Sequence, residues 1–363
     1  MAQIESGQVV AFFLFDVSES IRLEELRSLA GLGTTSTRFT TRVAAPAYVQ
    51  YQPPPVTLSG AALGMKTIEG FKAAFKIYEY GVVSVALTLD FRGTWVELDV
   101  LAHSLTDSDL IESAAEAACA RVVERIKGSI VRLRPAYVSE DYFVFGVTQL
   151  NRSMIARELL ESHGADIARL LRGERKALSA DEIAEVLRHR LSYLADDLIV
   201  PTWSAAFVYD SEGIEPALEI IEFANSQLLQ FRYYDELLDN ELTRIYPVIQ
   251  RRRWYDTLVG GRYGRAAGRL HSLFIDVNEI TDRTENALKI VGDVYAARVF
   301  QLVGTRLGLD AWKQAVREKL KTLDDIYRFT VEQVNMTRGH LLELTIIVIL
   351  LFELWLFFIG VMT

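Results

Sequence analysis

The stretch that decides the fold lies late in the sequence, where residues 344–352 read LTIIVILLF and, after Glu353, residues 354–362 read LWLFFIGVM. A helix needs about 20 mainly apolar residues to cross the roughly 30 Å hydrocarbon layer of a membrane. The apolar side chains of this stretch fall on every face of a helix, whereas a helix packed on a water-soluble domain carries one apolar stripe. The sequence therefore predicts a single transmembrane helix over 341–362.

Charges beside this stretch predict its orientation. Arg328, Arg338 and His340 precede it, and no basic residue follows it. Basic residues stay on the cytoplasmic side of a membrane helix. The start of the chain carries neither a signal peptide nor an Arg-rich presequence. We therefore expect a tail-anchored, single-pass protein of the bacterial inner (cytoplasmic) membrane, with its N-terminal body in the cytoplasm.

Two acidic residues lie within or beside the predicted span. Glu353 falls near its middle, where an ionised carboxylate costs several kcal/mol. A protonated Glu353 that hydrogen-bonds a neighbouring helix in a homo-oligomer is the favoured interpretation. A ligand or proton site, a carboxyl tolerated by local thinning of the bilayer, and a buried helix of a soluble domain stay open. Glu343 lies about one turn inside the boundary, within reach of the headgroups.

Composition sets limits on the rest of the chain. Its 363 residues are enough for two domains, and half of them are hydrophobic. The net charge of −9 argues against non-specific coating of nucleic acid, although a local basic patch stays open. Cys119 is the single cysteine, so no disulfide forms within the chain, which is typical of a reducing compartment.

Residues 1–150 are predicted to form an α+β domain with a mainly antiparallel sheet and flanking helices. Ser18 is the expected cap of a short helix. Thr106 and Asp109 resemble a capping box that opens a helix ending near Lys127. Runs of apolar, aromatic and β-branched residues predict strands at 9–15, 72–80, 82–90, 94–101 and 142–148.

An all-α region is predicted to follow, with a helical domain over 151–258 and an irregular link over 197–210. Ser179 and Glu182 form a second capping-box pattern, and Pro216 suits the first turn of a long helix.

Residues 263–338 are then predicted to form a long antiparallel helical hairpin, a coiled-coil-like stalk broken at Gly308. Its apolar stripe favours packing within the chain, and packing between chains stays open.

Two segments resemble a known family. Residues 178–183 (LSADEI) and 191–201 (LSYLADDLIVP), followed by Tyr209-Asp210, are the first. The second is the ending, in which Arg338, Glu343 and Glu353 bracket an Ile/Val/Leu run. The chain is similar in these segments to the proteins called "required for meiotic nuclear division". The similarity extends from about residue 151 to the C-terminus and is weaker over the N-terminal strands.

This sequence departs from the family pattern at Leu344, where an aromatic residue is common, and in a loosened link around residues 203–207. The resemblance implies a membrane-tethered scaffold or adaptor. Eukaryotic members are inner-membrane proteins of mitochondria that support translation by tethering ribosomes near the membrane. The resemblance implies no catalytic residues.

No motif for chemistry is recognisable. The five histidines stand far apart and none has a His or Cys partner at metal-ligand spacing. Residues 260–264 (GGRYG) contain glycines but lack a preceding strand and a Lys-Ser/Thr pair, so they do not make a phosphate-binding loop. We therefore predict no catalytic residue, no cofactor and no metal site, and expect a protein that is not an enzyme.

One local concentration of charge stands out. Between residues 244 and 269 there are seven arginines against the single acid Asp256, with aromatic residues interleaved. Arginine binds phosphate bidentately and stacks on bases, so this patch suits RNA, a ribosome or anionic lipid headgroups. Pairing with acids elsewhere, or an oligomer contact, stays open. The predicted patch consists of Arg244, Arg251, Arg252, Arg253, Arg262, Arg265, Arg269, Trp254, Tyr255 and Tyr263.

These observations favour a membrane-anchored, homo-oligomeric scaffold or tether that holds a cytoplasmic body at the membrane. Its expected partners are further copies of itself, membrane lipid, and RNA or ribosomes through the arginine patch. The alternative is an ion- or proton-conducting membrane component with Glu353 in the path.

Overall fold

The computed structural model describes residues 3–28, 35–36, 54–65, 67–106, 108–250, 274–275 and 294–361. The chain divides into two compact units. The first unit joins Met1–Tyr233 to Thr284–Trp312, and the second joins Tyr234–Arg283 to Lys313–Thr363.

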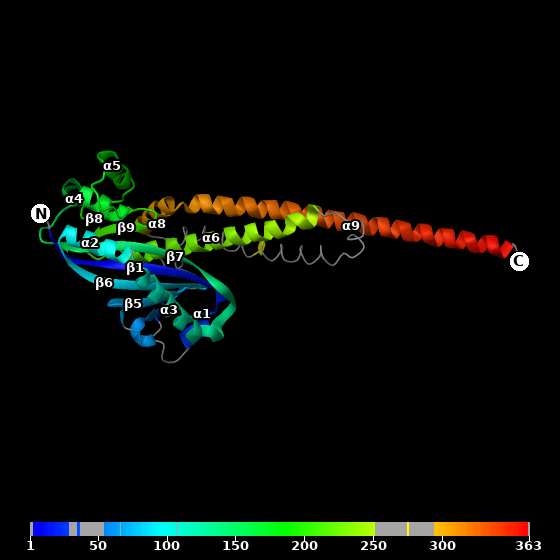
Figure 1. Cartoon of the computed structure of the whole chain (residues 1–363), viewed down its shortest axis with the longest axis horizontal. Helices are drawn as coiled ribbons and strands as arrows, with labels where there is room; N and C mark the ends of the chain where they lie inside the picture. Colours follow the sequence, from blue (N-terminus) through cyan, green and yellow to red (C-terminus); the bar gives the residue numbers. More distant parts are fainter. Residues whose placement is uncertain are drawn as a thin grey trace. The chain divides into compact units, whose positions relative to one another are not determined.

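The first unit is built on a nine-stranded mixed sheet (Figure 1). Its order is β2-β3-β5-β6-β1-β7-β9-β8, with β4 paired to β5. Neighbouring strands are antiparallel except β7 and β9, which run parallel. The strands are β1 (Ile4–Ile21), β2 (Thr35–Ser36), β3 (Val56–Ser59), β4 (Thr67–Ile68), β5 (Phe71–Ile77), β6 (Val82–Gly93), β7 (Ile130–Leu150), β8 (Asp197–Pro201) and β9 (Ala205–Asp210).

Helices follow β1, β6, β7 and β9 along the chain. Two of them, α6 and α9, contribute residues to both units. The described helices are α1 (Leu23–Ser28), α2 (Trp95–Thr106), α3 (Asp109–Ile126), α4 (Ala156–Arg172), α5 (Ala180–Arg188), α6 (Glu215–Gln250), α8 (Val294–Leu307) and α9 (Leu309–Val361), with 3-10 turns at Gly60–Leu63 and Lys127–Ser129.

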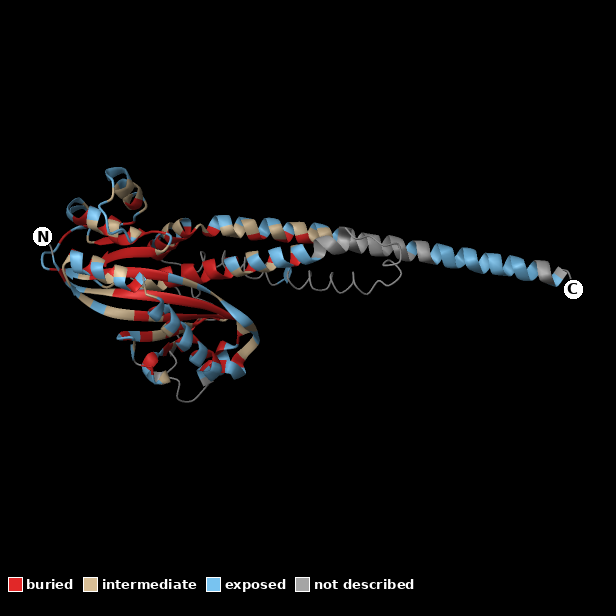
Figure 2. Cartoon of the chain, in the orientation of Figure 1, coloured by how far each residue is buried: buried red, intermediate tan, exposed pale blue. Residues whose placement is uncertain are grey.

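The central strand β1 is buried on both faces. Val9, Ala11 and Phe13 point to one face, where they join an apolar core with residues of α1 to α5. The next residues along the strand point to the opposite face and are also buried, Phe12 and Leu14 among them. Side chains alternate between the faces of a strand, so both faces of the sheet must be covered. Figure 2 shows the strands as the main buried part of this unit.

The second face of the sheet is covered by the start of α6. Gly146 in β7 makes room for this approach, because a Cβ atom there would lie 2.1 Å from Ile214 Cδ1. Polar contacts also join α6 to this face, including Tyr80 Oη to Ser226 Oγ at 2.7 Å. The sheet therefore lies between helices on both sides.

The strand predicted at 94–101 is wrong, because this segment is helix α2. Thr94 and Glu97 form a capping box, in which the Glu97 amide donates to Thr94 Oγ1 (3.2 Å) and the Thr94 amide donates to Glu97 Oε2 (2.7 Å). These bonds satisfy amides that a helix start leaves without partners. The β-branched and aromatic residues favour a strand, but the capping box at Thr94 and Glu97 stabilises the start of a helix.

The region after residue 150 is not all-α, contrary to the prediction. The expected irregular link over 197–210 is a hairpin of β8 and β9, and it joins the same sheet through β7. Every residue of both strands is buried. A strand buried on both faces lacks the alternating pattern that makes a strand recognisable.

Two of the predicted helix caps are wrong. Ser18 lies within β1, where its hydroxyl donates to the Ser20 carbonyl (3.2 Å). The helix expected after Thr106 is α3, but it begins after Ser108, and the Thr106 hydroxyl bonds back to Ala102 in α2. Ser179 does cap α5, because its side chain accepts from the Glu182 amide at 3.2 Å.

In the second unit, α6 and α9 pack against each other. Lys319 in α9 forms ion pairs with Asp235 (2.7 Å) and Asp239 (2.6 Å) of α6. The buried apolar residues beside these pairs are Leu238, Val316, Leu320 and Leu323. In α9 the buried residues Val316, Leu320 and Leu323 recur every three or four positions, as expected of a helix that packs along one side.

The transmembrane helix predicted over 341–362 is wrong. No helix in the part of the chain that the structure describes is long and apolar enough to cross a membrane. Residues 344–352 do lie within the helix α9, but Glu343 and Glu353 bound this apolar run. Nine residues of helix rise only about 14 Å, roughly half of the hydrocarbon thickness. The description of the chain as a tail-anchored transmembrane protein is corrected accordingly.

Gly81 provides a test of the close contact between the turn before β6 and the central strand β1. It has φ +85°, and a Cβ atom there would lie 1.8 Å from the Ser18 carbonyl oxygen. We expect Gly81→Ala to lower the free energy of unfolding by more than about 2 kcal/mol, through strain and this clash. Gly173→Ala is the control, since Gly173 also has positive φ but open space around it, and should cost about 1 kcal/mol. Equal losses in urea denaturation would contradict this account.

Candidate functional site

The structure describes only three of the residues predicted to form sites. Glu343 and Glu353 lie in α9 and are exposed. Arg244 lies late in α6, where its Nη1 is 2.8 Å from Glu241 Oε1. The predicted residues that lie outside the described residues are Arg251, Arg252, Arg253, Trp254, Tyr255, Arg262, Tyr263, Arg265 and Arg269.

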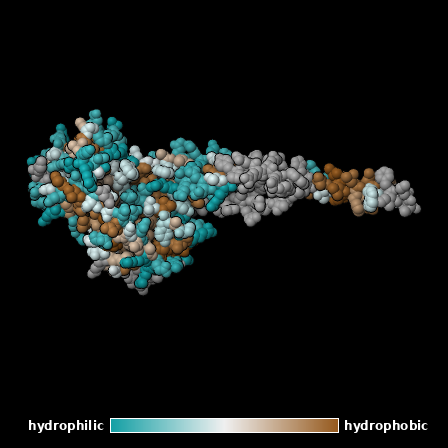
Figure 3. Space-filling model, in the orientation of Figure 1, coloured by the Kyte–Doolittle hydropathy of each residue, from teal (hydrophilic) through white to brown (hydrophobic). Residues whose placement is uncertain are grey.

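Between and around these two glutamates, α9 exposes a continuous apolar surface. We call residues 342–357 the apolar α9 segment. Its large apolar side chains are each 48–67% exposed, and Figure 3 shows them as a brown region on the helix. They are Leu342, Leu344, Ile346, Ile347, Val348, Ile349, Leu350, Leu351, Phe352, Leu354, Trp355, Leu356 and Phe357.

Such a surface indicates an interaction site. Proteins seldom expose contiguous apolar patches larger than a few hundred Å² unless a partner covers them. Residues 346–352 are seven consecutive apolar residues, nearly two helical turns, so the surface surrounds the helix. A single flat partner would leave one side of it in water.

A second candidate lies within the first unit, between the sheet and α6. Asp16 of β1 is fully buried, and its Oδ1 accepts a 2.7 Å hydrogen bond from Arg134 Nε of β7. The Arg134 guanidinium also lies 3.5 Å above the ring centroid of Tyr233 in α6. We call these residues, together with Gln230, the buried polar cluster.

Burial changes the acidity of this cluster. Loss of solvation raises the pKa of Asp16 from 3.8 to about 6, because water no longer stabilises the carboxylate. The positive charge of Arg134 and its hydrogen bond to Asp16 oppose this rise. A carboxyl in such a site changes its charge close to neutral pH, which is typical of functional or regulatory residues.

Several polar atoms of the cluster have no hydrogen-bond partner among the described residues. These atoms are Asp16 Oδ2, Arg134 Nη2 and both polar atoms of the Gln230 amide, and Ser84 Oγ in β6 shares this property. Buried polar atoms usually bind ordered water when no protein partner is present. The cluster therefore has the donors and acceptors to hold water between β1 and α6.

Ion pairs on either side hold α6 in place over the cluster. Lys76 of β5 pairs with Glu222, and Glu140 of β7 pairs with Arg232. The Lys76–Glu222 pair is almost fully buried, so removing one partner would leave an uncompensated charge. These contacts fix both the position and the rotation of α6 on the sheet.

Sequence reasoning missed this cluster. The strand predicted at 9–15 stops short of Asp16, whereas β1 continues past it to Ile21. A usable signal lay in α6, where polar residues recur at helical spacing on a face that apolar residues flank. The buried members of that face are Glu222, Asn225, Ser226, Gln227 and Gln230.

Other reactive side chains of the described chain have structural surroundings. Burial raises the pKa of the Cys119 thiol to about 12, so it stays protonated at neutral pH. His163 stacks on Trp95 at 4.7 Å and lies 3.0 Å from Asp166. Within the described ranges, no group of three His, Cys, Asp or Glu side chains is placed to hold a metal ion.

The pH dependence of stability tests the cluster. Because the pKa of Asp16 is raised in the folded state, its contribution favours folding below pH 3.8 and is lost as pH rises through about 6. This loss amounts to about 3 kcal/mol. We expect Asp16→Asn to remove that part of the fall in unfolding free energy between pH 4 and pH 7, measured by urea denaturation.

Asp90→Asn is the matched control for this experiment. Asp90 lies in the same sheet and pairs with Lys72, but its side chain is 67% exposed. Its replacement should leave the pH dependence nearly unchanged. The altered contact of residue 16 with Arg134 shifts the whole stability profile by a constant amount, so the slope with pH is the diagnostic quantity. Parallel pH profiles for the Asp16→Asn protein and the unaltered protein would refute the assignment.

Comparison with known proteins places the first unit's sheet in a family. The chain is 26% identical over 189 residues to the uncharacterized protein MJ0711 of Methanocaldococcus jannaschii, a match that covers 52% of this chain and 57% of that protein. The chain therefore spans less than two thirds of that relative's length. No solved structure matches the chain. The family model "Uncharacterized protein MJ0711, N-terminal domain" matches residues 6–215, a range that holds Asp16 and Arg134 and ends as α6 begins. Since this match covers more than half of the chain, the protein belongs to the MJ0711 N-terminal domain family.

Proposed function

We propose that this protein is a homo-oligomeric scaffold, whose copies associate through the apolar α9 segment. The observation that carries the proposal is the exposed apolar surface over residues 342–357. Figure 2 shows most of this stretch in the colour of exposed residues. Because the surface surrounds the helix, several copies of the same helix in a bundle would cover it better than one groove would.

The size of the surface is sufficient for association. Full burial of one Leu, Ile or Phe side chain contributes about 1.5–3 kcal/mol. Six such side chains per copy would contribute about 9–18 kcal/mol. This is comparable to or larger than the cost of association, which is about 4–15 kcal/mol. A bundle that covers half of the segment therefore gains a burial free energy of the size that association requires.

Glu353 gives the bundle its register. A single polar residue in an apolar helix interface favours the alignment in which identical residues meet, since any offset buries it against apolar side chains. Glu353 interrupts the segment between Phe352 and Leu354. Parallel, in-register helices would place the copies of Glu353 at one level, where they share water or a proton.

This proposal includes neither of the other predicted activities. The ion-path alternative requires a helix that crosses a membrane, and none of the described helices qualifies. The link to RNA or ribosomes depends on the arginine patch, which, Arg244 apart, lies outside the described residues. It stays a prediction, as does the resemblance to the meiotic nuclear division family.

The oligomeric state tests the proposal. We expect sedimentation equilibrium of the whole chain to give a mass that is two or more times its 41.0 kDa, by a whole number. The double variant Leu350→Asp, Leu354→Asp should sediment as a monomer, because charges at these positions cannot be buried in the bundle. Val100→Asp is the control, since Val100 is 65% exposed but lies in α2. A monomeric unaltered chain, or an unchanged mass of the double variant, would contradict the proposal.

Glu353 has its own expected effect. Glu353→Leu should associate at least as tightly, because it removes the cost of burying a carboxyl group. It should also yield a mixture of oligomer sizes, because the residue that fixes the register is gone. Glu353→Gln, which keeps a polar side chain, should retain one size. Sedimentation velocity distinguishes these cases, and a single size for Glu353→Leu would show that Glu353 does not set the register.

A further inference from the structure

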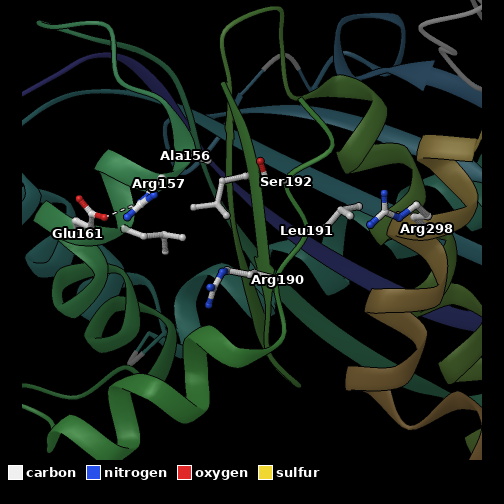
Figure 4. A pocket seen from close by; sticks show the side chains of 9 residues that line it. Ala156, Arg157, Glu161, Arg190, Leu191, Ser192 and Arg298 are labelled. Carbon is white, nitrogen blue, oxygen red and sulfur yellow. Dashed lines mark hydrogen bonds and ion pairs between the residues drawn. The ribbon is translucent and has the colours of Figure 1, made fainter. Parts of the chain in front are cut away.

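A cleft of about 650 Å³ lies in the first unit (Figure 4). Its walls come from α4, the loop after α5, β8 and α8. Three of its lining residues are arginines and one is an acid. The residues that line it are Ala156, Arg157, Leu160, Glu161, Arg190, Leu191, Ser192, Leu198 and Arg298.

Two of the three arginines of this cleft carry positive charge that no described acidic residue neutralises. Arg157 pairs with Glu161 at 2.8 Å. Arg190 donates to the backbone carbonyl of Leu187 and has no acidic partner among the described residues. Arg298 has neither an ion pair nor a hydrogen bond to any residue that the structure describes. In a chain with net charge −9, a local excess of arginine stands out.

The segment that carries Arg190 is fixed before any ligand binds. Leu191 and Ile199 exchange backbone hydrogen bonds of 2.9 and 2.8 Å, which attach the loop to β8. Asp197 Oδ1 accepts from the Tyr193 amide at 2.6 Å. The Tyr193 ring meets the ring of Tyr295 in α8 edge-on, with centroids 5.6 Å apart. The loop with Arg190 is thereby attached to the helix with Arg298, and binding need not order it.

The cleft also has an apolar part. Leu160 is partly buried and Leu191 is 6% exposed, so these two give the cleft apolar surface beside the charged groups, whereas Leu198 is fully buried. Figure 4 shows Arg157 and Arg190 on one side of Leu191 and Arg298 on the other. Ligand sites of this kind have volumes of about 300–1,000 Å³ and combine apolar walls with a few polar groups.

We infer that this cleft binds a small organic phosphate, a molecule with a phosphate or diphosphate group and an apolar part. Guanidinium groups bind phosphate oxygens through paired, charge-assisted hydrogen bonds, and they are the most effective side chains for this purpose. Leu160 and Leu191 would contact the apolar part of the ligand. This inference is independent of the proposed scaffold, because the cleft and the apolar α9 segment belong to different units.

Calorimetric titration of the full-length chain tests the inference, with ADP and inorganic pyrophosphate as probes. We expect ADP to bind, and pyrophosphate to bind more weakly because it cannot contact the leucines. The variant Arg190→Gln, Arg298→Gln should weaken ADP binding by at least tenfold for each guanidinium removed, about 100-fold in total. Binding should also weaken as salt concentration rises.

Arg188→Gln is the matched control. Arg188 lies at the end of α5, two residues from Arg190, and pairs with Glu185 outside the cleft. Its replacement should leave ADP binding unchanged. If the double variant proves unfolded by circular dichroism, Arg298→Gln alone should still weaken binding about tenfold. Absence of ADP binding at concentrations up to about 1 mM would overturn the inference. Equal binding by the unaltered and substituted chains, or equal binding of pyrophosphate and ADP, would do so as well.

Discussion

The structure depends on the burial of β1 on both of its faces and both of its edges. The strand pairs with β6 on one side and β7 on the other, so its backbone groups are satisfied by neighbours and not by water. Its side chains fill the apolar core on one face and meet α6 on the other. No face of β1 can be left open, so helices must cover the sheet on both sides. The positions of α2 to α5 and of α6 follow from this requirement.

The two faces are closed by different means. Apolar packing covers one of them and is tolerant of small displacements. The other adds charged and hydrogen-bonded contacts, among them Asp16 with Arg134 and Lys76 with Glu222. Buried ion pairs contribute little net stability, but a misplaced one is strongly unfavourable. The polar contacts therefore serve to select one position for α6, while apolar side chains are buried on both faces of the sheet.

Much of the architecture follows from local patterns in the sequence, and the failures have identifiable causes. The apolar run at 9–15 predicts a strand correctly because it is long and β-rich, and Ser179 with Glu182 predicts the start of α5. Residues 94–101 were mistaken for a strand because a cap at Thr94 outweighs β-propensity. β8 and β9 were missed because burial on both faces removes the alternation. The polar cluster and the arginine cleft depend on contacts between distant segments, which no local pattern encodes. The apolar α9 segment was found, but its interruption by Glu353 was given too little weight.

The pairing of β1 with β7 has a consequence for synthesis of the chain. The register joins Ile4 to Leu150, so the first strand to leave the ribosome must wait for nearly 150 further residues before one of its edges is filled. Contacts so distant in sequence form slowly because a long loop must close first. During that delay, a β-rich apolar strand with an unpaired edge is a template for aggregation. A cell that makes this protein must keep β1 from pairing with other chains, so its yield should depend on chaperones and on the rate of translation.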